Sequence, residues 1–326
     1  MRLAVVVALL ATGAGMVGIG QTQGIQPVPL ASGETANGLA LPARRFTLLA
    51  ERRYTMHAGI RPLYVFWIRR DNVGSARFCW RQGPDGSRGY EMVVGSDPNR
   101  APRKVNKWGY FSEESTPAGI AMLGIMKASN EETITDVEKT LETEGKGGAA
   151  FRYTAIRSEV RAENGRTGIF RMGVDRDLTY RDVEQLLTMI PADVRTDKTY
   201  RLPPGVRGGY LQTIAEILHG SVQWYRTKGA TPRVEGRGFR YMYNGGPYEM
   251  VLRSSKFVPR AKFKNLEWTN LVEGHFRITN QTTGFKTDFR VDYGTEGELA
   301  EVPVHVVFQP RWWLEVELVL DEKGVY

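Results

Sequence analysis

The sequence of 326 residues contains one cysteine, Cys79, and only four histidines, and both scarcities restrict its chemistry. A single cysteine cannot form an intrachain disulfide. No histidine has a second histidine three or four residues away, which disfavours a zinc site. Phosphate-binding loops, dinucleotide fingerprints and the Gly-x-Ser-x-Gly nucleophile motif are also missing. We therefore expect no metal and no cofactor.

Long hydrophobic runs are missing beyond the N-terminus, because charged or turn residues interrupt every later apolar stretch. Arg2 precedes an apolar run over residues 3–20, and polar residues begin at Gln21. This pattern predicts a secretory signal peptide at 1–20, with an uncleaved anchor as the alternative. Prolines and glycines in 21–43 indicate a flexible linker. We expect a periplasmic or secreted protein with no membrane span in the mature chain.

Glycine and proline are abundant, with 36 and 16 residues, and they favour turns over long helices. Alternating apolar and polar residues predict antiparallel β regions at 44–112 and 236–321. The clearest alternation begins at Val272, and Leu314 to Leu320 is predicted as a further strand. The segment between these regions, 113–235, has a mixed pattern that predicts three helices and a hairpin. The hairpin is expected over 151–172.

The three helices are expected near 129–145, 179–190 and 209–225, and the first two open on capping-box patterns. The predicted fold class is α+β and β-dominated. Its antiparallel meanders form a β-sandwich or a partly closed β-barrel with a central helical segment. The range 44–321 is compatible with one domain or two.

Strands 272–279 and 285–293 are predicted to pair as a hairpin with Ile278 opposite Phe285. This register places His275 opposite Asp288 on the solvent face. The pair is a candidate oriented base for catalysis. The alternative is an ordinary cross-strand pair at the surface.

The tetrapeptide Tyr-Glu-Met-Val occurs at 90–93 and at 248–251, each time after an aromatic strand and a glycine/proline turn. The recurrence fits either an internal duplication or two hairpins with the same turn chemistry. Its glutamates, Glu91 and Glu249, are candidate acids of a glycoside hydrolase, since two catalytic carboxylates need only meet in space. Both lie opposite the apolar face of their strands, which predicts solvent exposure.

Basic residues exceed acidic ones by 44 to 36, which gives a net charge of +8 and a pI near 9.5. Arg77 and Arg81 flank Cys79 on one strand face, so Cys79 is either a reactive thiolate or a small buried side chain. For an exported protein the anionic partners are envelope lipids, cell-wall polymers or acidic glycans, and not nucleic acid. An acidic partner of this kind would be held by the arginines.

Arg311, Trp312 and Trp313 follow Pro310 and could present indole rings to a sugar or a membrane surface. We expect a non-catalytic protein that binds an anionic or amphipathic envelope component. The expected ligand-binding residues are Arg77, Arg81, Arg311, Trp312 and Trp313, with ligand held in an apolar interior. The alternatives are a glycan-acting hydrolase and an outer-membrane β-barrel. Three predicted helices and the charges at 321–323 oppose the barrel.

Overall fold

The computed structural model describes residues 39–40, 46–61, 67–83, 85–127, 151–191, 193–194, 198–207, 209–231, 233–234, 238–243, 246–311 and 314–321. The predicted signal peptide, most of the predicted linker and the helix predicted near 129–145 lie outside these residues. Leu39–Ala40, within the predicted linker, forms the short strand β1, which pairs with β9 (Asp193–Val194). No helix in the described part of the chain is long and apolar enough to cross a membrane.

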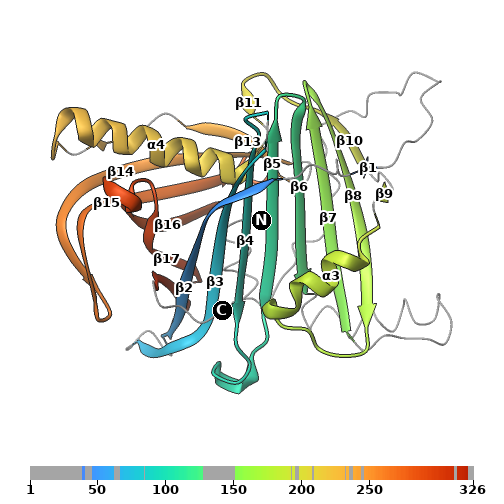
Figure 1. Cartoon of the computed structure of the whole chain (residues 1–326), viewed down its shortest axis with the longest axis horizontal. Helices are drawn as coiled ribbons and strands as arrows, with labels where there is room; N and C mark the ends of the chain where they lie inside the picture. The colour runs from blue at the N-terminus through green and yellow to red at the C-terminus, as the bar shows by residue number, and fades with distance from the viewer. Residues whose placement is uncertain are drawn as a thin grey trace.

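One antiparallel sheet of sixteen strands dominates the structure and does not close, so the predicted β-dominated α+β class is confirmed (Figure 1). Its first half is β2 (Thr47–Ile60), β3 (Ile68–Gln82), β4 (Arg88–Ser96), β5 (Trp108–Thr116), β6 (Gly119–Lys127), β7 (Phe151–Arg161), β8 (Asn164–Val174) and β10 (Lys198–Arg201). Its second half is β11 (Val206–Arg207), β12 (Arg233–Val234), β13 (Phe239–Tyr243), β14 (Gly246–Phe263), β15 (Leu266–Asn280), β16 (Lys286–Gly294), β17 (Pro303–Arg311) and β18 (Leu314–Leu320).

The two halves meet where β18 pairs with β2, so strands near the two ends of the chain are neighbours at the centre of the sheet. From this seam the strands follow in chain order outward to β10, and in reverse order from β18 to β11. Consecutive antiparallel strands need only short hairpin connections, which the many glycine and proline residues supply.

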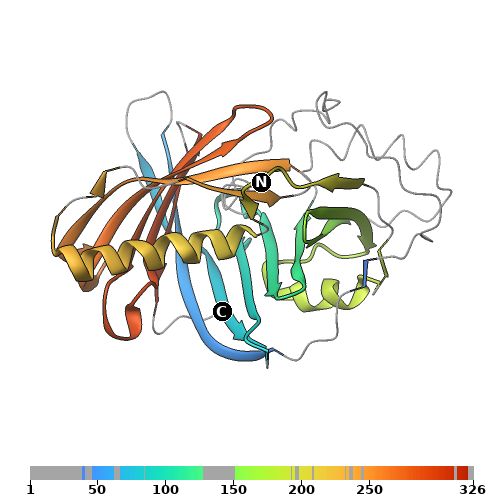
Figure 2. The ribbon, with the colours of Figure 1, turned by 90° about the horizontal axis from the view of Figure 1, so that it is seen from above.

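Helix α4 (Tyr210–Lys228) covers one face of the sheet, which we name the α4 face (Figure 2). Apolar residues on one side of the helix pack into the larger core with Val291 of β16 and Val306 of β17. A buried hydrogen bond from the Tyr293 hydroxyl to Ser221 Oγ, 2.7 Å long, fixes the middle of the helix. The predicted helix near 209–225 is thus confirmed.

The N-terminus of α4 is held by a carboxylate from β5. Glu113 is fully buried, and its two oxygens accept hydrogen bonds from the backbone nitrogens of Leu211 and Gln212, each 2.9 Å long. These nitrogens are orphan donors of the first helical turn, and they favour negative charge. Burial nevertheless outweighs these hydrogen bonds and raises the pKa of Glu113 to about 7. Gly209 leaves room for the carboxylate, because a Cβ there would lie 2.3 Å from Glu113 Oε1.

The opposite face of the sheet, the α3 face, carries a second core beneath a short helical segment. This segment consists of the 3₁₀-helix η3 (Tyr180–Asp182) and α3 (Val183–Met189). The capping box of Thr179 and Asp182 is formed as predicted. Trp108 is fully buried beneath the segment and donates from Nε1 to the Leu178 carbonyl at 2.8 Å.

Several sequence expectations require correction. In the mixed segment 113–235 the hairpin predicted over 151–172 is formed by β7 and β8, but strand β6, which was not predicted, joins this hairpin to β5 and continues the meander. Residues 70–74, whose Asp-Asn and Gly residues are typical of a turn, are part of β3, where Asn72 adopts a positive φ of 56° beside a bulge in the pairing with β2. Phe285, predicted as the first residue of a strand, precedes β16 and is 50% exposed.

Candidate functional site

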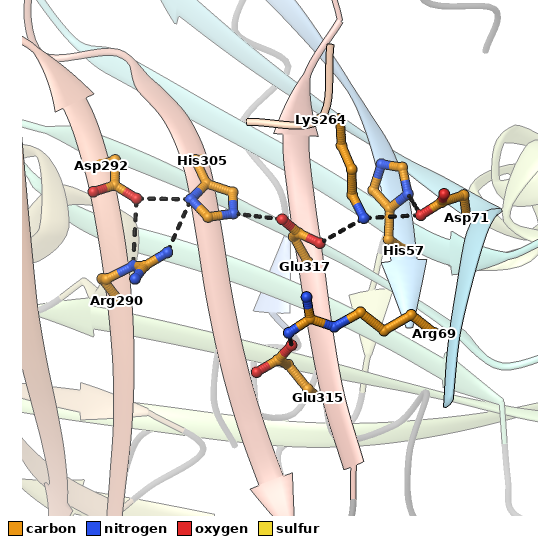
Figure 3. A network of polar contacts seen from close by, with 9 residues as sticks. All are labelled: His57, Arg69, Asp71, Lys264, Arg290, Asp292, His305, Glu315 and Glu317. Atoms are coloured by element: carbon orange, nitrogen blue, oxygen red, sulfur yellow. Dashed lines mark hydrogen bonds and ion pairs between the residues drawn. The ribbon is translucent and has the colours of Figure 1, made fainter. Parts of the chain in front are cut away.

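A chain of ionisable side chains crosses the α3 face of β16, β17, β18 and β2 (Figure 3). At its centre His305, 2% exposed, lies between two carboxylates. Its Nδ1 is 2.7 Å from Asp292 Oδ2, and its Nε2 is 2.9 Å from Glu317 Oε1. The ring of Phe263, at the tip of the β14–β15 hairpin, stacks on the imidazole with centroids 4.0 Å apart. The hairpin tip therefore covers His305 on the α3 face.

The chain continues through the hairpin tip to the seam strand β2. Lys264 Nζ lies 3.2 Å from Glu317 Oε2 and 2.8 Å from Asp71 Oδ1. Asp71 Oδ1 is also 2.8 Å from Nδ1 of His57, which is 6% exposed. Lys264 thus ties the tip of one hairpin to two strands on either side of β2.

The geometry of His305 has a direct chemical consequence. Burial disfavours the charged ring, but hydrogen bonds to Asp292 and Glu317 outweigh it and raise the pKa of His305 above its ordinary value of 6.5. Burial likewise opposes ionisation of Glu317, yet His305 and Lys264 lower the pKa of Glu317 to about 2. With both ring nitrogens bound to carboxylates, no ring nitrogen is left to exchange a proton with a substrate.

The space beside this network is small. A shallow hollow lined by residues that include His57, Arg69, Lys264 and Glu317 has no enclosed room for a water molecule. Binding sites for small molecules usually measure about 300–1,000 Å³. The network therefore fits a structural clasp for the β14–β15 hairpin better than it fits a substrate site.

The sequence shows the two histidines of this network but not their partners. His57 and His305 stand alone in the chain, with no ligand spacing around them. Asp292 and Glu317 alternate with apolar residues, as outward residues of any strand do. Only the pairing of β16 with β17 and of β17 with β18 brings them to His305.

Arg77, Arg81 and Glu91 form a second cluster on the α3 face, on adjacent strands β3 and β4. One oxygen of Glu91 accepts from Arg77 and the other from Arg81, each at 2.9 Å. Glu91 is only 9% exposed, so the predicted solvent exposure is wrong. The two arginines compensate the negative charge of Glu91, and both arginine side chains are half-buried.

Cys79 lies between these arginines and is 3% exposed. Burial raises the pKa of its thiol to about 11, and nearby Glu91 and Glu51 add to the effect that the arginines oppose. A buried thiol of high pKa is a poor nucleophile. The interpretation as a small buried side chain is therefore confirmed, and the reactive thiolate is not supported.

The remaining catalytic candidates are not brought together. Glu91 on β4 and Glu249 on β14 are separated by six strands in the sheet, and the carboxylate of Glu249 lies 3.9 Å from Nε of Arg240. Asp288 forms two hydrogen bonds with Arg277, of 2.7 and 2.8 Å.

The predicted register of the β15–β16 hairpin is wrong by two residues. Ile278 pairs with Thr287, and His275 therefore lies opposite Arg290. The turn closes later than predicted, with Gly284 at a φ of 69° and a hydrogen bond from the Asn280 nitrogen to the Phe285 carbonyl. His275 instead contacts Glu273 on its own strand, at 3.0 Å.

One end of the sheet collects basic connections. The strand pairings place the β15–β16, β17–β18, β2–β3 and β4–β5 connections at this end, side by side in the sheet order. We name it the basic edge, and Figure 1 shows the β4–β5 connection at the bottom of the view. Its connections and their flanking residues contain Arg61, Arg69, Arg70, Arg100, Arg103, Lys104, Lys107, Lys286 and Arg311.

The connections at the other end of the same strands have the opposite charge. Residues 83–87, 117–118 and 295–302 contain no lysine or arginine, whereas the β14–β15 connection carries Lys264, which is bound to Asp71 and Glu317. Residues 83–87 and 295–302 contain Asp85, Glu296, Glu298 and Glu301. The sheet therefore has a charge difference from one end to the other that net charge alone does not reveal.

Exposed apolar side chains accompany the positive charge at the basic edge. Ile60 and Ile68, which pair with each other across β2 and β3, are 44% and 41% exposed. Val105 and Phe285, on two other connections of this edge, are 37% and 50% exposed. Arg311 pairs with Leu314 at the same edge, while its side chain, Trp312 and Trp313 lie outside the described parts.

No family model matches the chain, and no curated protein matches it. Among solved structures, the chain is similar to a protein of Brucella abortus described as a beta-barrel-like protein of domain of unknown function DUF1849. The two share 7% sequence identity with a TM-score of 0.39, over 86% of this chain and 98% of that chain. The fold class stated above rests on the strand pairings of this chain itself.

Proposed function

We propose that this protein is exported and binds an anionic, amphipathic component of the cell envelope at the basic edge, without catalysing a reaction. The observation that carries the proposal is the coincidence of positive charge and exposed apolar side chains at one end of the sheet. Arg70 is exposed beside Ile68, and Lys104 is exposed beside Val105. A molecule with an anionic head and an apolar part would satisfy both kinds of group at once.

The other predicted ligand-binding residues fit this proposal unequally. Arg311 ends β17 and pairs with Leu314 at the basic edge, whereas Trp312 and Trp313 lie outside the described residues. Arg77 and Arg81 lie elsewhere, and both are bound to Glu91. We assign them a role in supporting α3 and the strands beneath it.

The structure favours a ligand bound at the basic edge over a ligand buried in the interior. Buried residues of α4, including Leu218 and Val222, occupy the α4 face together with core residues of the sheet. The absence of catalysis is supported by the carboxylates discussed above, since Glu91 and Asp288 are both bound to arginine. Glycoside hydrolysis would need two acids facing one cleft.

The proposal is tested with the chain expressed with its own N-terminus and recovered from the exported fraction. Native mass spectrometry should give a mature mass that begins near Gln21. Lysophosphatidylglycerol below its micelle concentration should add to this mass, and lysophosphatidylcholine should add far less. Retention of Met1 would contradict export, and equal addition of the two lipids would contradict recognition of the anionic head.

A further inference from the structure

We propose that the basic edge docks on the surface of an anionic lipid bilayer, with its exposed apolar side chains inserted among the lipid headgroups. This inference rests on the proposed function and names the partner as a membrane surface rather than a single dispersed molecule. It concerns only the described residues of the edge.

The shape of the edge favours a surface over a single molecule. Eight neighbouring strands, from β15 through β18 and β2 to β5, contribute to it. At about 4.8 Å between strands, the edge extends roughly 34 Å along the sheet. Ile60, Val105 and Phe285 stand on three separate connections of this edge. Groups spread over this length can contact many headgroups at once.

The charge of the edge fits an anionic leaflet. Arg70, Lys104 and Lys286 are exposed residues on three different connections or their flanks. In the flanks, Asp288 is bound to Arg277 and Glu315 to Arg69. Within the four connections the acidic residue is Asp97, which is 5% exposed and lies 3.2 Å from Nη2 of Arg181. It therefore contributes little negative potential to the surface. Basic residues near an anionic membrane each strengthen binding by roughly fivefold.

The acidic connections at the other end of the sheet give the docked molecule an orientation. Glu296, Glu298 and Glu301 lie at that end, where an anionic leaflet would repel them. The basic edge can approach the membrane without this repulsion. The strands then stand with their basic ends toward the lipid.

The experiment measures partition of the exported protein into vesicles of phosphatidylglycerol and phosphatidylcholine by flotation. The charge variant carries Arg70→Gln, Lys104→Asn and Lys286→Gln, where asparagine suits the positive φ of 54° at position 104. Its control, Arg201→Gln, Lys228→Gln and Arg253→Gln, removes the same charge from exposed positions outside the edge. The charge variant should partition on the order of 100-fold less, and the control within twofold of wild type.

A second pair of variants tests the apolar contacts. Ile60→Thr with Ile68→Thr keeps β-branched residues in the strands while removing exposed hydrocarbon. Leu48→Thr with Leu49→Thr makes the same change at the other end of β2, where the leucines are 51% and 61% exposed. The first pair should weaken partition at least tenfold and the second should not. Melting temperatures close to wild type confirm that each variant is folded.

Wild-type protein gives a further test that does not depend on any variant. Its partition into phosphatidylglycerol vesicles should fall steeply with added salt, and phosphatidylcholine vesicles should bind it weakly. Equal partition into phosphatidylglycerol and phosphatidylcholine vesicles would overturn the inference. An equal loss of partition in the basic-edge variants and their control variants would overturn it as well. Binding of dispersed lysophosphatidylglycerol without vesicle binding would also overturn it, while leaving the proposed function in place.

Discussion

Replacing Glu113 by glutamine is expected to remove a large pH dependence from the stability of this protein. The carboxyl group is fully buried at the N-terminus of α4, and its pKa rises from 4.5 to about 7 on folding. The folded chain then binds more protons than the unfolded chain between these two values. Its stabilising contribution is complete below pH 4.5 and is lost as the pH rises through 7.

The magnitude follows from the shift. The pKa of Glu113 differs between the unfolded chain (4.5) and the folded chain (about 7), and each pKa unit corresponds to 1.36 kcal/mol. The unfolding free energy should therefore fall by about 3 kcal/mol as the pH rises from below 4.5 to above 7. Glutamine has no proton to exchange, so the Glu113→Gln variant should lack this part of the pH dependence. The quantity to compare is the difference in unfolding free energy between wild type and variant at each pH.

Urea unfolding followed by tryptophan fluorescence, at several pH values from 4.5 to 8, measures this difference. Groups such as His57 and His305 titrate in both proteins, so their effects cancel in the comparison. Glu267→Gln, on the exposed side of β15, serves as a control and should keep the wild-type pH dependence. Parallel curves for wild type and Glu113→Gln would refute the assignment of a raised pKa to this buried carboxyl.

Two further predictions concern buried groups on the α3 face. His305→Gln should lower the unfolding free energy by about 1.5–3 kcal/mol near pH 6 in chemical denaturation, because Asp292 and Glu317 lose a charged hydrogen-bond partner while Arg290 and Lys264 remain beside them. The raised pKa of His305 means that this loss should shrink as the pH rises through the folded-state pKa, and a constant loss would contradict the charged ring. Cys79 should react with iodoacetamide at pH 8 far more slowly in the folded protein than in urea, as followed by mass spectrometry, and equal rates would show that the thiol is accessible.

Local pattern was sufficient for many elements of this fold. Strand β18 occupies 314–320 as its alternation predicts, because a strand with one buried face must alternate apolar and polar residues. Helix α4 and the capping box at Thr179 were likewise readable from periodicity and side-chain chemistry within a few residues. These features depend on neighbours in the chain, so distant contacts were not needed to predict them.

The local sequence pattern did not determine the pairing register of the strands. The β15–β16 hairpin differs from its predicted pairing by two residues, and a slip of two leaves every side chain on the same face of the sheet. Hydrophobic alternation therefore fits both registers equally well. The longer turn and the pair of hydrogen bonds between Arg277 and Asp288 select the observed one.

The sequence contains the residues of the His305 network and of the basic edge, but the order of the strands in the sheet brings them together. His57 and Glu317 face each other only because β2 pairs with β18, which joins segments about 260 residues apart. The same pairing sets the β2–β3 connection beside the β17–β18 connection and so completes the basic edge. Composition determines that the chain is basic, whereas the order and direction of the strands determine that this charge gathers at one end.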